Sequence, residues 1–337
     1  IRPRMMALDE EQQADLVQLF LSMKQTKLSL NPYYKLFFLA YAESANSELS
    51  EETYDQWIAT LIDMLQVGQS NRANKVKAFL EFSNSYFKNG ALKASEGGSN
   101  WRVLSYHSEM GFQEDKPFLK FEETDLLAFS KKDSMIISKT IGSFLPLQNK
   151  WIGEGGTVDW DEGDLGPISA DFKTYTIDTK KGIYNVDEAF LTFDKYFGQN
   201  TIKGKFQDKL SNEKLKQHPR FISEERGLVI NDLGPNLSLT GGIELRGQKL
   251  FSTGVKDNLA AMQLRDQNGK VKFKLGAKSF GVQKSSEISG KNMSATLYFD
   301  QDSIYHPSVN VKYYPTENTL RVLKGETAID AVPFYDS

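Results

Sequence analysis

The chain has 337 residues, a formal net charge of −3 and no cysteine. This length allows two domains, at roughly 100–200 residues each, and 22 Phe and 14 Tyr supply the bulky flat side chains that strands favour. The balance of 41 basic and 44 acidic residues gives no broad positive field, which argues against a nucleic-acid partner. The lack of cysteine excludes disulfides, thiolate zinc sites and cysteine nucleophiles. No apolar run approaches the roughly 18 residues of a membrane span.

Apolar side chains recur at helical spacing through the first 90 residues and predict four helices. Asp9 and Ser50 are suited to cap the first and third helices, Pro32 suits the first turn of the second, and Asn89-Gly90 ends the fourth. Short connections favour antiparallel neighbours, so residues 1–94 are expected to form an antiparallel helical bundle. The expected core positions are Leu16, Leu19, Phe20, Met23, Leu36, Leu39, Ala40, Trp57, Leu61, Met64, Leu65, Val76, Phe79, Leu80, Ser83 and Phe87.

The spacing of apolar residues changes after a glycine- and serine-rich stretch at residues 95–100, which predicts a linker. Beyond it, apolar and polar residues alternate in segments such as 118–123, 170–178, 269–275 and 294–299, which is typical of strands. A short helix near residues 212–217 is the one helix expected there. We therefore predict an α+β chain in which residues 101–337 form a predominantly antiparallel β region. Stacked β layers of the solenoid type are the expected arrangement, and a β-sandwich is the alternative.

Two stretches of the β region, at about residues 125–160 and 294–329, match one another without gaps. Each has an aromatic residue, an Asp-Ser pair, a proline, a large apolar residue and a glycine at the same separations. This pattern predicts a three-strand unit used twice, which favours stacked layers. Unrelated hairpins with similar turns are the alternative. The matching positions are Phe129, Asp133, Ser134, Pro146, Trp151 and Gly156 in the first copy, and Tyr298, Asp302, Ser303, Pro315, Leu320 and Gly325 in the second.

The most acidic loop of the chain is a candidate metal site. Asp159, Asp161 and Asp164 surround Gly163, and carboxylates at such spacing are ligands that Ca²⁺ prefers. Ala170 stands where an EF-hand loop needs a bidentate Glu, so the loop departs from that pattern. Ca²⁺ is thus the one cofactor considered, and a solvated acidic turn is the alternative reading.

Three tryptophans are candidates for a carbohydrate-binding surface, because exposed aromatic rings can stack on sugars. They are Trp101, Trp151 and Trp160. The alternative is that Trp151 and Trp160 are core residues of their strands.

The sequence offers no catalytic motif of the familiar kinds, since a nucleophile elbow, a P-loop and HExxH are all missing. The segment Gly153-Glu154-Gly155-Gly156 precedes a strand rather than a helix, so we expect a bulge or tight turn there and no phosphate site. Glycoside hydrolysis needs only two suitably separated acids, and with 44 acidic residues the sequence cannot select a pair.

Several motifs occur together in one order: Thr124-Asp125-Leu126, Lys132-Asp133-Ser134, Ile141-Gly142-Ser143-Phe144, the stretch from Trp151 to Trp160, Pro219-Arg220-Phe221, Gly241-Gly242 and Asp302-Ser303-Ile304-Tyr305-His306-Pro307. In these motifs the chain resembles a family of very long proteins of Gram-negative gliding and gut-commensal bacteria. The family carries no established activity and brings no catalytic residues. The resemblance implies a larger parent protein that is exported, to the periplasm or the outer membrane.

These observations favour a non-catalytic scaffold or binding protein of the cell envelope, with other envelope proteins as partners and a glycan or lipid as a further candidate ligand. Two alternatives remain. One is an enzyme that acts on polysaccharide with carboxylates in a groove along the β stack, which would need two acids in an open groove flanked by aromatic residues. The other is a β trough that binds lipid or glycolipid.

Overall fold

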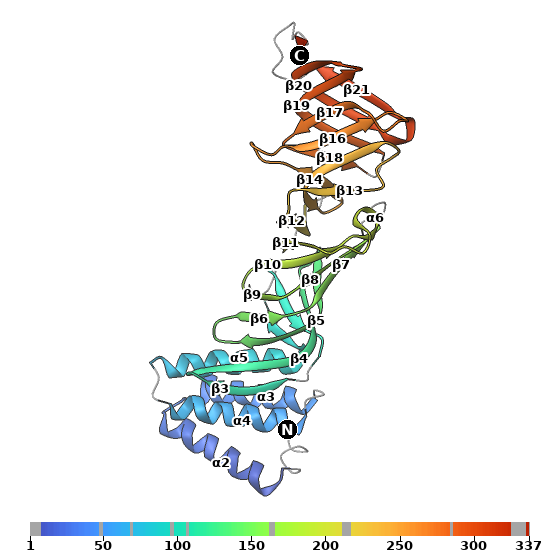
Figure 1. Ribbon diagram of the computed structural model, residues 1–337. Helices are drawn as coiled ribbons and strands as arrows, with labels where there is room; N and C mark the ends of the chain where they lie inside the picture. The colour runs from blue at the N-terminus through green and yellow to red at the C-terminus, as the bar shows by residue number, and fades with distance from the viewer. Residues whose placement is uncertain are drawn as a thin grey trace. The chain divides into compact units, whose positions relative to one another are not determined.

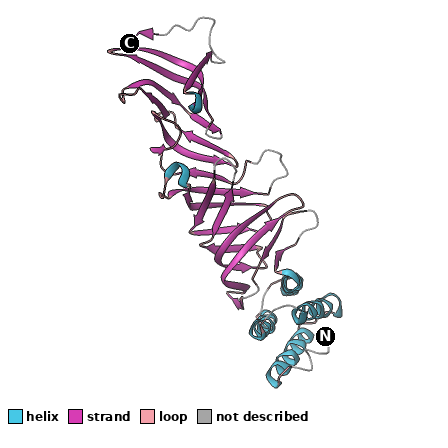
Figure 2. Cartoon of the chain, turned by 90° about the vertical axis from the view of Figure 1, so that its right-hand side faces the viewer, coloured by secondary structure: helices cyan, strands magenta, loops and turns pink. Residues whose placement is uncertain are grey.

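The computed structural model describes residues 8–46, 50–67, 70–94, 98–105, 108–161, 166–210, 217–283, 286–324 and 335–336. It contains 51% strand and 25% helix, with the helices at the start of the chain and antiparallel strands after them, which confirms the predicted α+β class (Figures 1 and 2). The chain divides into two compact units. Unit 1 comprises residues 1–157, 172–185 and 209–212, and unit 2 comprises residues 158–171, 186–208 and 213–337.

The first part of unit 1 holds the helices that the sequence predicts, and their ends lie where expected. The Asp9 carboxylate accepts a hydrogen bond of 2.8 Å from the backbone N–H of Gln12, and the Ser50 hydroxyl accepts one of 3.1 Å from that of Thr53. Gly90 ends the last helix in the left-handed conformation, at φ 71°. The helices are α2 (Glu10–Gln25), α3 (Lys35–Asn46), preceded by the irregular turn η1 (Leu30–Tyr34), α4 (Glu51–Gln66) and α5 (Arg72–Asn89).

The expected core positions of α4 and α5 are all buried, as are three of the four on α2, whereas the prediction for α3 was wrong at one of them. Leu39 is 45% exposed, and the buried stripe runs instead through Phe37, Ala40 and Tyr41 at i, i+3 and i+4. Phe37 stacks on Trp57 of α4 with ring centroids 5.4 Å apart and planes 3° apart. The inward face of α3 is therefore the one that carries Phe37.

The helices pack on the first strands and share a core with them. The Tyr86 ring of α5 meets that of Phe121 at 6.4 Å, and Phe121 meets Trp151 at 5.5 Å. The Gln56 side chain accepts a hydrogen bond of 2.7 Å from the backbone N–H of Met110. The secondary structure thus changes from helix to strand near residue 95, as predicted. Unit 1 nevertheless continues across that position. Residues 95–97 themselves lie outside the described residues.

Most consecutive strands are separated by only a few residues. The segment 170–178, expected as one strand, is two strands separated at Lys173, and the helix α6 (Asp194–Phe197) was not predicted. Residues 212–216 of the short helix expected near 212–217 lie outside the described residues. The strands are β1 (Ala91–Lys93), β2 (Asn100–Val103), β3 (Glu109–Gln113), β4 (Lys116–Phe129), β5 (Ser134–Leu145), β6 (Lys150–Glu154), β7 (Thr157–Asp161), β8 (Pro167–Phe172), β9 (Thr174–Asp178), β10 (Ile183–Thr192), β11 (Ile202–Lys209), β12 (Arg220–Ser223), β13 (Leu228–Ile230), β14 (Leu237–Arg246), β15 (Lys249–Thr253), β16 (Ala260–Arg265), β17 (Val271–Ala277), β18 (Ser279–Gln283), β19 (Glu287–Phe299), β20 (Asp302–Tyr314), β21 (Thr319–Lys324) and β22 (Tyr335–Asp336), with the 3-10 turn η3 (Pro315–Glu317) before β21.

Antiparallel pairing joins the strands of each unit into a continuous sheet. In unit 1, β3, β4, β5, β6 and β9 pair in that order, and β2 pairs with the far half of β4. In unit 2, β12, β14, β15, β18, β19, β20 and β21 pair in that order, and β17 pairs with the far half of β19. The long strands β4 and β19 therefore occupy corresponding places in the two units.

The strand pairs β4–β5 and β19–β20 have the same register and the same irregularities. On β4 the register shifts between Phe121 and Thr124 and again before Leu126. On β19 it shifts between Gly290 and Met293 and again before Ala295. These positions correspond one to one when Asp133-Ser134 is laid on Asp302-Ser303. The following turns also agree, since Asn149 and Asn318 both have positive φ, 53° and 47°.

Among the described helices, none combines the length and the apolar character that a membrane-crossing helix requires.

Candidate functional site

A hollow with a volume of about 700 Å³ lies on one face of the unit 2 sheet. Its axis is a row of residues that stand directly opposite one another on neighbouring strands. Phe251 of β15 faces Gly281 of β18, which faces Ser289 of β19, which faces Lys312 of β20. Because directly paired residues lie on the same face of a sheet, these four side chains share one surface.

Small residues make the floor of this hollow. Gly281, Ser279 and Ser289 line its centre, with Gly290 beside them. A Cβ added to Gly281 would meet the Phe251 ring at 3.5 Å and the backbone oxygen of Ser289 at 3.9 Å, which are ordinary contacts. The missing side chain at Gly281 is thus not required by packing, and it leaves the surface open.

Lysines surround the floor. Lys249, Lys278, Lys291 and Lys312 all line the hollow, and Glu287 is the one acidic residue among its described lining residues. The Lys312 ammonium lies 3.1 Å from the Glu287 carboxylate, whereas Lys249 and Lys278 are exposed and make no ion pair with another described residue. The lining therefore carries an excess of positive charge.

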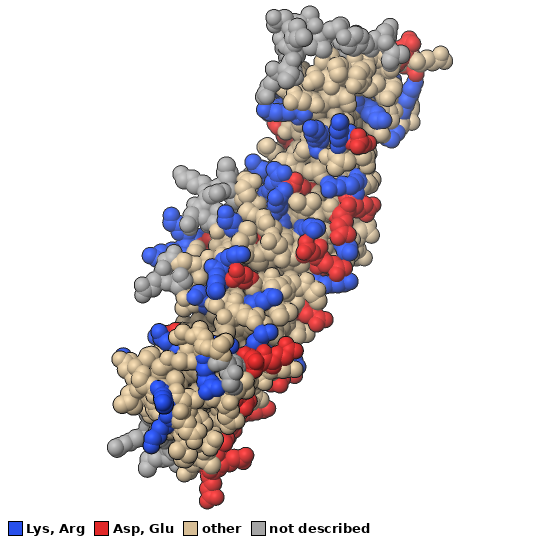
Figure 3. All heavy atoms as spheres, turned by 90° about the vertical axis from the view of Figure 1, so that its left-hand side faces the viewer, with Lys and Arg blue, Asp and Glu red and all other residues tan. Residues whose placement is uncertain are grey.

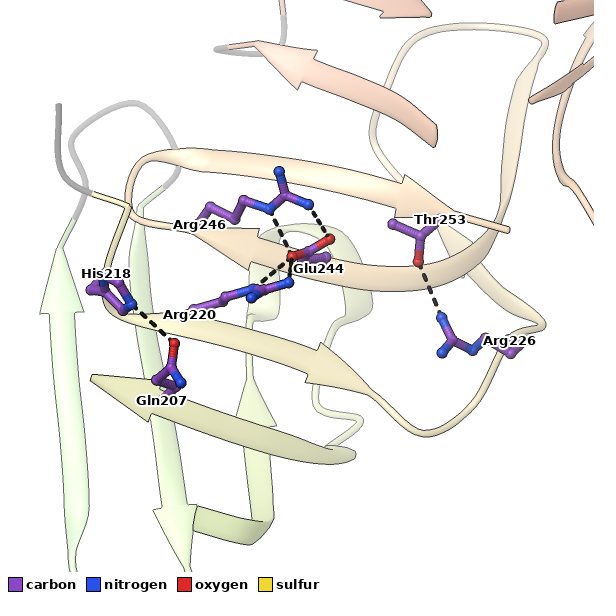
Figure 4. Close-up of polar contacts among 7 residues, drawn as sticks. All are labelled: Gln207, His218, Arg220, Arg226, Glu244, Arg246 and Thr253. Carbon is purple, nitrogen blue, oxygen red and sulfur yellow. Dashed lines mark hydrogen bonds and ion pairs between the residues drawn. The ribbon is translucent and has the colours of Figure 1, made fainter. Parts of the chain in front are cut away.

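Beside the hollow, the buried carboxylate of Glu244 lies between two arginines (Figure 4). Its Oε1 accepts hydrogen bonds of 2.7 Å from Nε of Arg220 and Nε of Arg246, and its Oε2 accepts one of 2.7 Å from Nη2 of Arg246. Burial alone raises the pKa of this carboxyl, but the hydrogen bonds and charges of Arg246 and Arg220 outweigh burial and hold the pKa below its ordinary value. The same hydrogen bond to Glu244 stabilises the charged guanidinium, so it raises the pKa of Arg246. One carboxylate thus fixes two guanidinium groups on one face of the sheet.

The two arginines belong to a row of three cations. Arg220 stands directly opposite Arg246, and Arg246 stands directly opposite Lys249. Like charges in directly opposite positions destabilise a sheet, and Glu244 offsets only part of this repulsion. The Arg246 guanidinium also lies over the Phe251 ring, 4.9 Å from its centroid, which links the row to the hollow.

A second hollow, of about 550 Å³, lies at the corresponding place in unit 1 and has the opposite charge. Glu52, Glu109, Glu122 and Glu123 line it together with Lys120, and helix α4 forms one wall. The irregularity in β4 leaves the consecutive residues Glu122 and Glu123 both exposed. Their counterparts at the irregularity in β19 are Lys291 and Asn292, which are exposed as well.

The structure buries all three tryptophans that the sequence offered for a carbohydrate-binding surface. Trp101 is 1% exposed, Trp151 0% and Trp160 9%, so none of them presents a stacking face to solvent. Trp101 also donates a hydrogen bond of 2.9 Å to the backbone carbonyl of Lys181. The alternative reading of Trp151 and Trp160 as core residues is correct, because alternate residues of β6 and β7 face the core.

The acidic loop is only partly described. Asp159 is exposed and lines a hollow of about 330 Å³ that Asp194 also lines. The side chain of Asp161 and the whole of Asp164 lie outside the described residues, and within those residues no three acidic or histidine side chains gather as a metal site would require. The Ca²⁺ site therefore stays a prediction.

The glycine segment after β6 forms a strand end and a tight link, as expected. Gly153 lies in β6 against the Tyr175 ring, while Gly155 and Gly156 have φ 66° and 95° between β6 and β7.

The sequence did not reveal the lysine-lined hollow. Its four lysines are scattered over more than sixty residues of sequence, and each taken alone reads as a solvated strand position. The one local signal was the alternation of Asn310 and Lys312 on β20. On the molecular face drawn in Figure 3, acidic and basic side chains of the described residues are both present, so overall charge gives no pointer to the site. No family model, curated protein or solved structure matches this chain.

Proposed function

We propose that this chain is a non-catalytic binding and scaffold protein of the bacterial cell envelope, and that its ligand surface is the lysine-lined hollow of unit 2. The observation that carries the proposal is the combination of a small-residue floor, an aromatic wall at Phe251 and an excess of lysines in one hollow of about 700 Å³. Known ligand sites are concave, of about 300–1,000 Å³, and place a few polar groups around an apolar surface.

The scaffold part of the proposal has separate support. The equal register of β4–β5 and β19–β20 supports the internal repeat, and with it the stacking of similar β layers. On the helices, Val17, Leu21, Phe38 and Leu39 are between 37% and 59% exposed. Exposed apolar side chains of this kind support docking of the helical segment to another envelope protein.

A binding experiment with product analysis tests this function. The purified chain is incubated with neutral and acidic polysaccharides and with lipid vesicles, and both retention and newly formed reducing ends are measured. We expect retention by a polysaccharide without new reducing ends. New reducing ends would overturn the non-catalytic reading, and exclusive retention by vesicles would favour the lipid or glycolipid alternative. Fractionation of the source cells tests the location, and recovery only in the cytosol would contradict it.

The second candidate function is a polysaccharide-acting enzyme at the acidic hollow of unit 1. The gathering of Glu52, Glu109, Glu122 and Glu123 in one open depression favours it, since such hydrolysis uses a pair of carboxylates. Among the described residues that line this hollow none is aromatic, which lends the enzyme reading no further support. If the wild-type chain releases reducing ends and Glu109→Gln or Glu122→Gln abolishes the release, the enzyme reading is correct.

A further inference from the structure

We propose that the hollow of unit 2 binds an extended acidic glycan, one that carries carboxylate or sulfate groups, and that the corresponding hollow of unit 1 does not bind it. This inference rests on the proposed binding function and names the ligand class of the same site. It also assigns this ligand to one of two places that the chain builds on the same strand register.

The charge of the ligand follows from the groups around the hollow. Lys249 and Lys278 are exposed cations without an ion pair among the described residues, and Lys249 continues the row formed by Arg220 and Arg246. A row of like charges on paired strands raises the energy of the empty sheet. A bound anion relieves that repulsion, so carboxylate or sulfate groups gain more here than at an isolated surface lysine.

The length of the ligand follows from the strands that the hollow crosses. Its lining extends from β15 through β18 and β19 to β20, and Leu323 of β21 closes the far end. Three spacings between paired strands amount to about 14 Å, which exceeds the size of a single phosphate or sulfate ion. An extended chain is therefore a better match than a lone anion.

The neutral groups of the lining suit a sugar. Phe251 is half-buried, and its ring is held under the Arg246 guanidinium, so it presents a fixed apolar surface at one end of the floor. Ser279, Ser289, Gln283 and Asn310 place hydroxyl and amide groups along the same lining. Nucleic acid is negatively charged like an acidic glycan, but only its charge would attract it to the hollow. It therefore serves as the competing ligand in the test.

The difference between the units comes from the residues at the irregularity of the long strand. Lys291 and Asn292 stand in unit 2 where Glu122 and Glu123 stand in unit 1. Two adjacent carboxylates repel an anionic chain, and Glu52 of helix α4 adds a further carboxylate to the lining in unit 1. The same backbone geometry thus presents a cationic site in one unit and an anionic one in the other.

A charge-reversal pair tests the site. The probes are polygalacturonate for carboxylates, dextran sulfate for sulfates, and uncharged dextran, with affinity measured at low and at physiological salt. We expect Lys249→Glu with Lys278→Glu to weaken binding of an acidic probe at least tenfold. The matched control is Lys256→Glu with Lys274→Glu, which makes the same change of net charge at exposed lysines of unit 2 outside the hollow, and it should stay within about twofold. Equal loss in both variants would show that net charge alone acts, and would overturn the proposal.

A volume change tests the floor without altering charge. Gly281→Leu projects a side chain into the hollow from a position whose Cβ has ordinary contacts, so the fold should persist and binding should fall at least tenfold. Gly227→Leu is the control, because a Cβ there meets nothing within 4 Å and lies outside the hollow. Unchanged affinity of the Gly281→Leu variant, with unchanged thermal unfolding, would refute binding in the hollow.

An exchange between the units tests the assignment of the ligand to unit 2. Lys291→Glu should reduce affinity for the acidic probe several-fold, whereas Glu122→Gln should leave it unchanged. Equal effects in both units would contradict the assignment. Binding of uncharged dextran alone would refute the acidic ligand and leave the binding function standing, while binding of single-stranded DNA as tight as that of both acidic probes would refute a glycan site. Failure to bind any probe or polysaccharide would refute both proposals.

Discussion

Glu122 and Lys291 occupy the same position in two corresponding strand pairs and carry opposite charges. Each follows a register shift that turns two consecutive side chains toward solvent, so neither contributes to the core. Because no packing constraint acts on these positions, their charge is free to differ between the units. The irregularity of the strand is therefore the structural feature that both hollows share, and the residues on it set their chemistry.

Removal of the Glu244 carboxylate is expected to destabilise unit 2. In a Glu244→Gln variant the guanidinium groups of Arg220 and Arg246 lose their shared anion while still facing each other across β12 and β14. The arginine side chains are about 40% exposed, which moderates the loss, so we expect about 1–3 kcal/mol. Urea unfolding at pH 7 measures it. A change below about 0.5 kcal/mol would show that the cluster contributes nothing to stability.

The contribution of Glu244 should also depend on pH. Its pKa lies below the ordinary 4.5, because the two arginines outweigh burial. The stabilisation is then fully present above pH 4.5 and is lost as the pH falls through the lower pKa of the folded state. The difference in unfolding free energy between wild type and Glu244→Gln should accordingly shrink from pH 6 to pH 3. A constant difference over that range would contradict the assignment.

Tyr175 provides an alkaline counterpart in unit 1. Burial raises the pKa of its phenol to about 12, and the hydroxyl is hydrogen-bonded to that of Thr140. Because the pKa is higher in the folded state than in the unfolded state, the protonated phenol contributes stability that is fully present below pH 10. This contribution, about 2–3 kcal/mol in all, is lost as the pH rises toward 12. Tyr175→Phe should therefore be about 1 kcal/mol less stable than wild type at pH 8 and lose less stability between pH 9 and 11.5. Parallel curves for the two proteins would refute this assignment.

Gly153 is predicted to be intolerant of any side chain. A Cβ at this position would lie 2.4 Å from Cζ of Tyr175 and 2.6 Å from Nε1 of Trp151, and both rings are buried. A shift of either buried ring would disturb the core, so Gly153→Ala should cost about 1–3 kcal/mol of unfolding free energy. Gly227→Ala is the control, since its Cβ meets no atom within 4 Å. Thermal unfolding of both variants decides the matter, and equal melting temperatures would be evidence against the close packing of β6 on Tyr175.

The corresponding turn residues Asn149 and Asn318 should respond differently to glycine. Both have positive φ, which glycine adopts without strain, so Asn149→Gly should be neutral within about 0.5 kcal/mol. Asn318 additionally accepts a hydrogen bond of 2.9 Å from the Tyr313 hydroxyl, so Asn318→Gly should cost about 1 kcal/mol. Valine at either position should cost about 1–2 kcal/mol. A neutral valine variant would show that the turn conformation is not required.

The sequence alone determined the class of the fold, the ends of the helices and the positions of most core residues that it predicted in the helices. Those features depend on short-range chemistry: Asp9 and Ser50 cap their own helices, Gly90 permits a left-handed end, and alternation along a strand selects its buried face. The matching stretches around Asp133 and Asp302 were also visible, because each turn specifies its own geometry. Leu39 was assigned wrongly since four apolar residues in a row leave the inward face of α3 to be chosen by its neighbours.

Tertiary structure decided which distant residues meet. The sequence does not show whether Trp101, Trp151 and Trp160 are buried or exposed. The packing of the strands decides this, and it buries all three. Lys249 and Lys278 come together with Lys312 because β15, β18, β19 and β20 pair side by side, and Glu244 meets Arg220 across β12 and β14. Charged residues this far apart in sequence become neighbours only when the strands pair in the right register. Register is a property of the whole sheet, and no local sequence pattern encodes it.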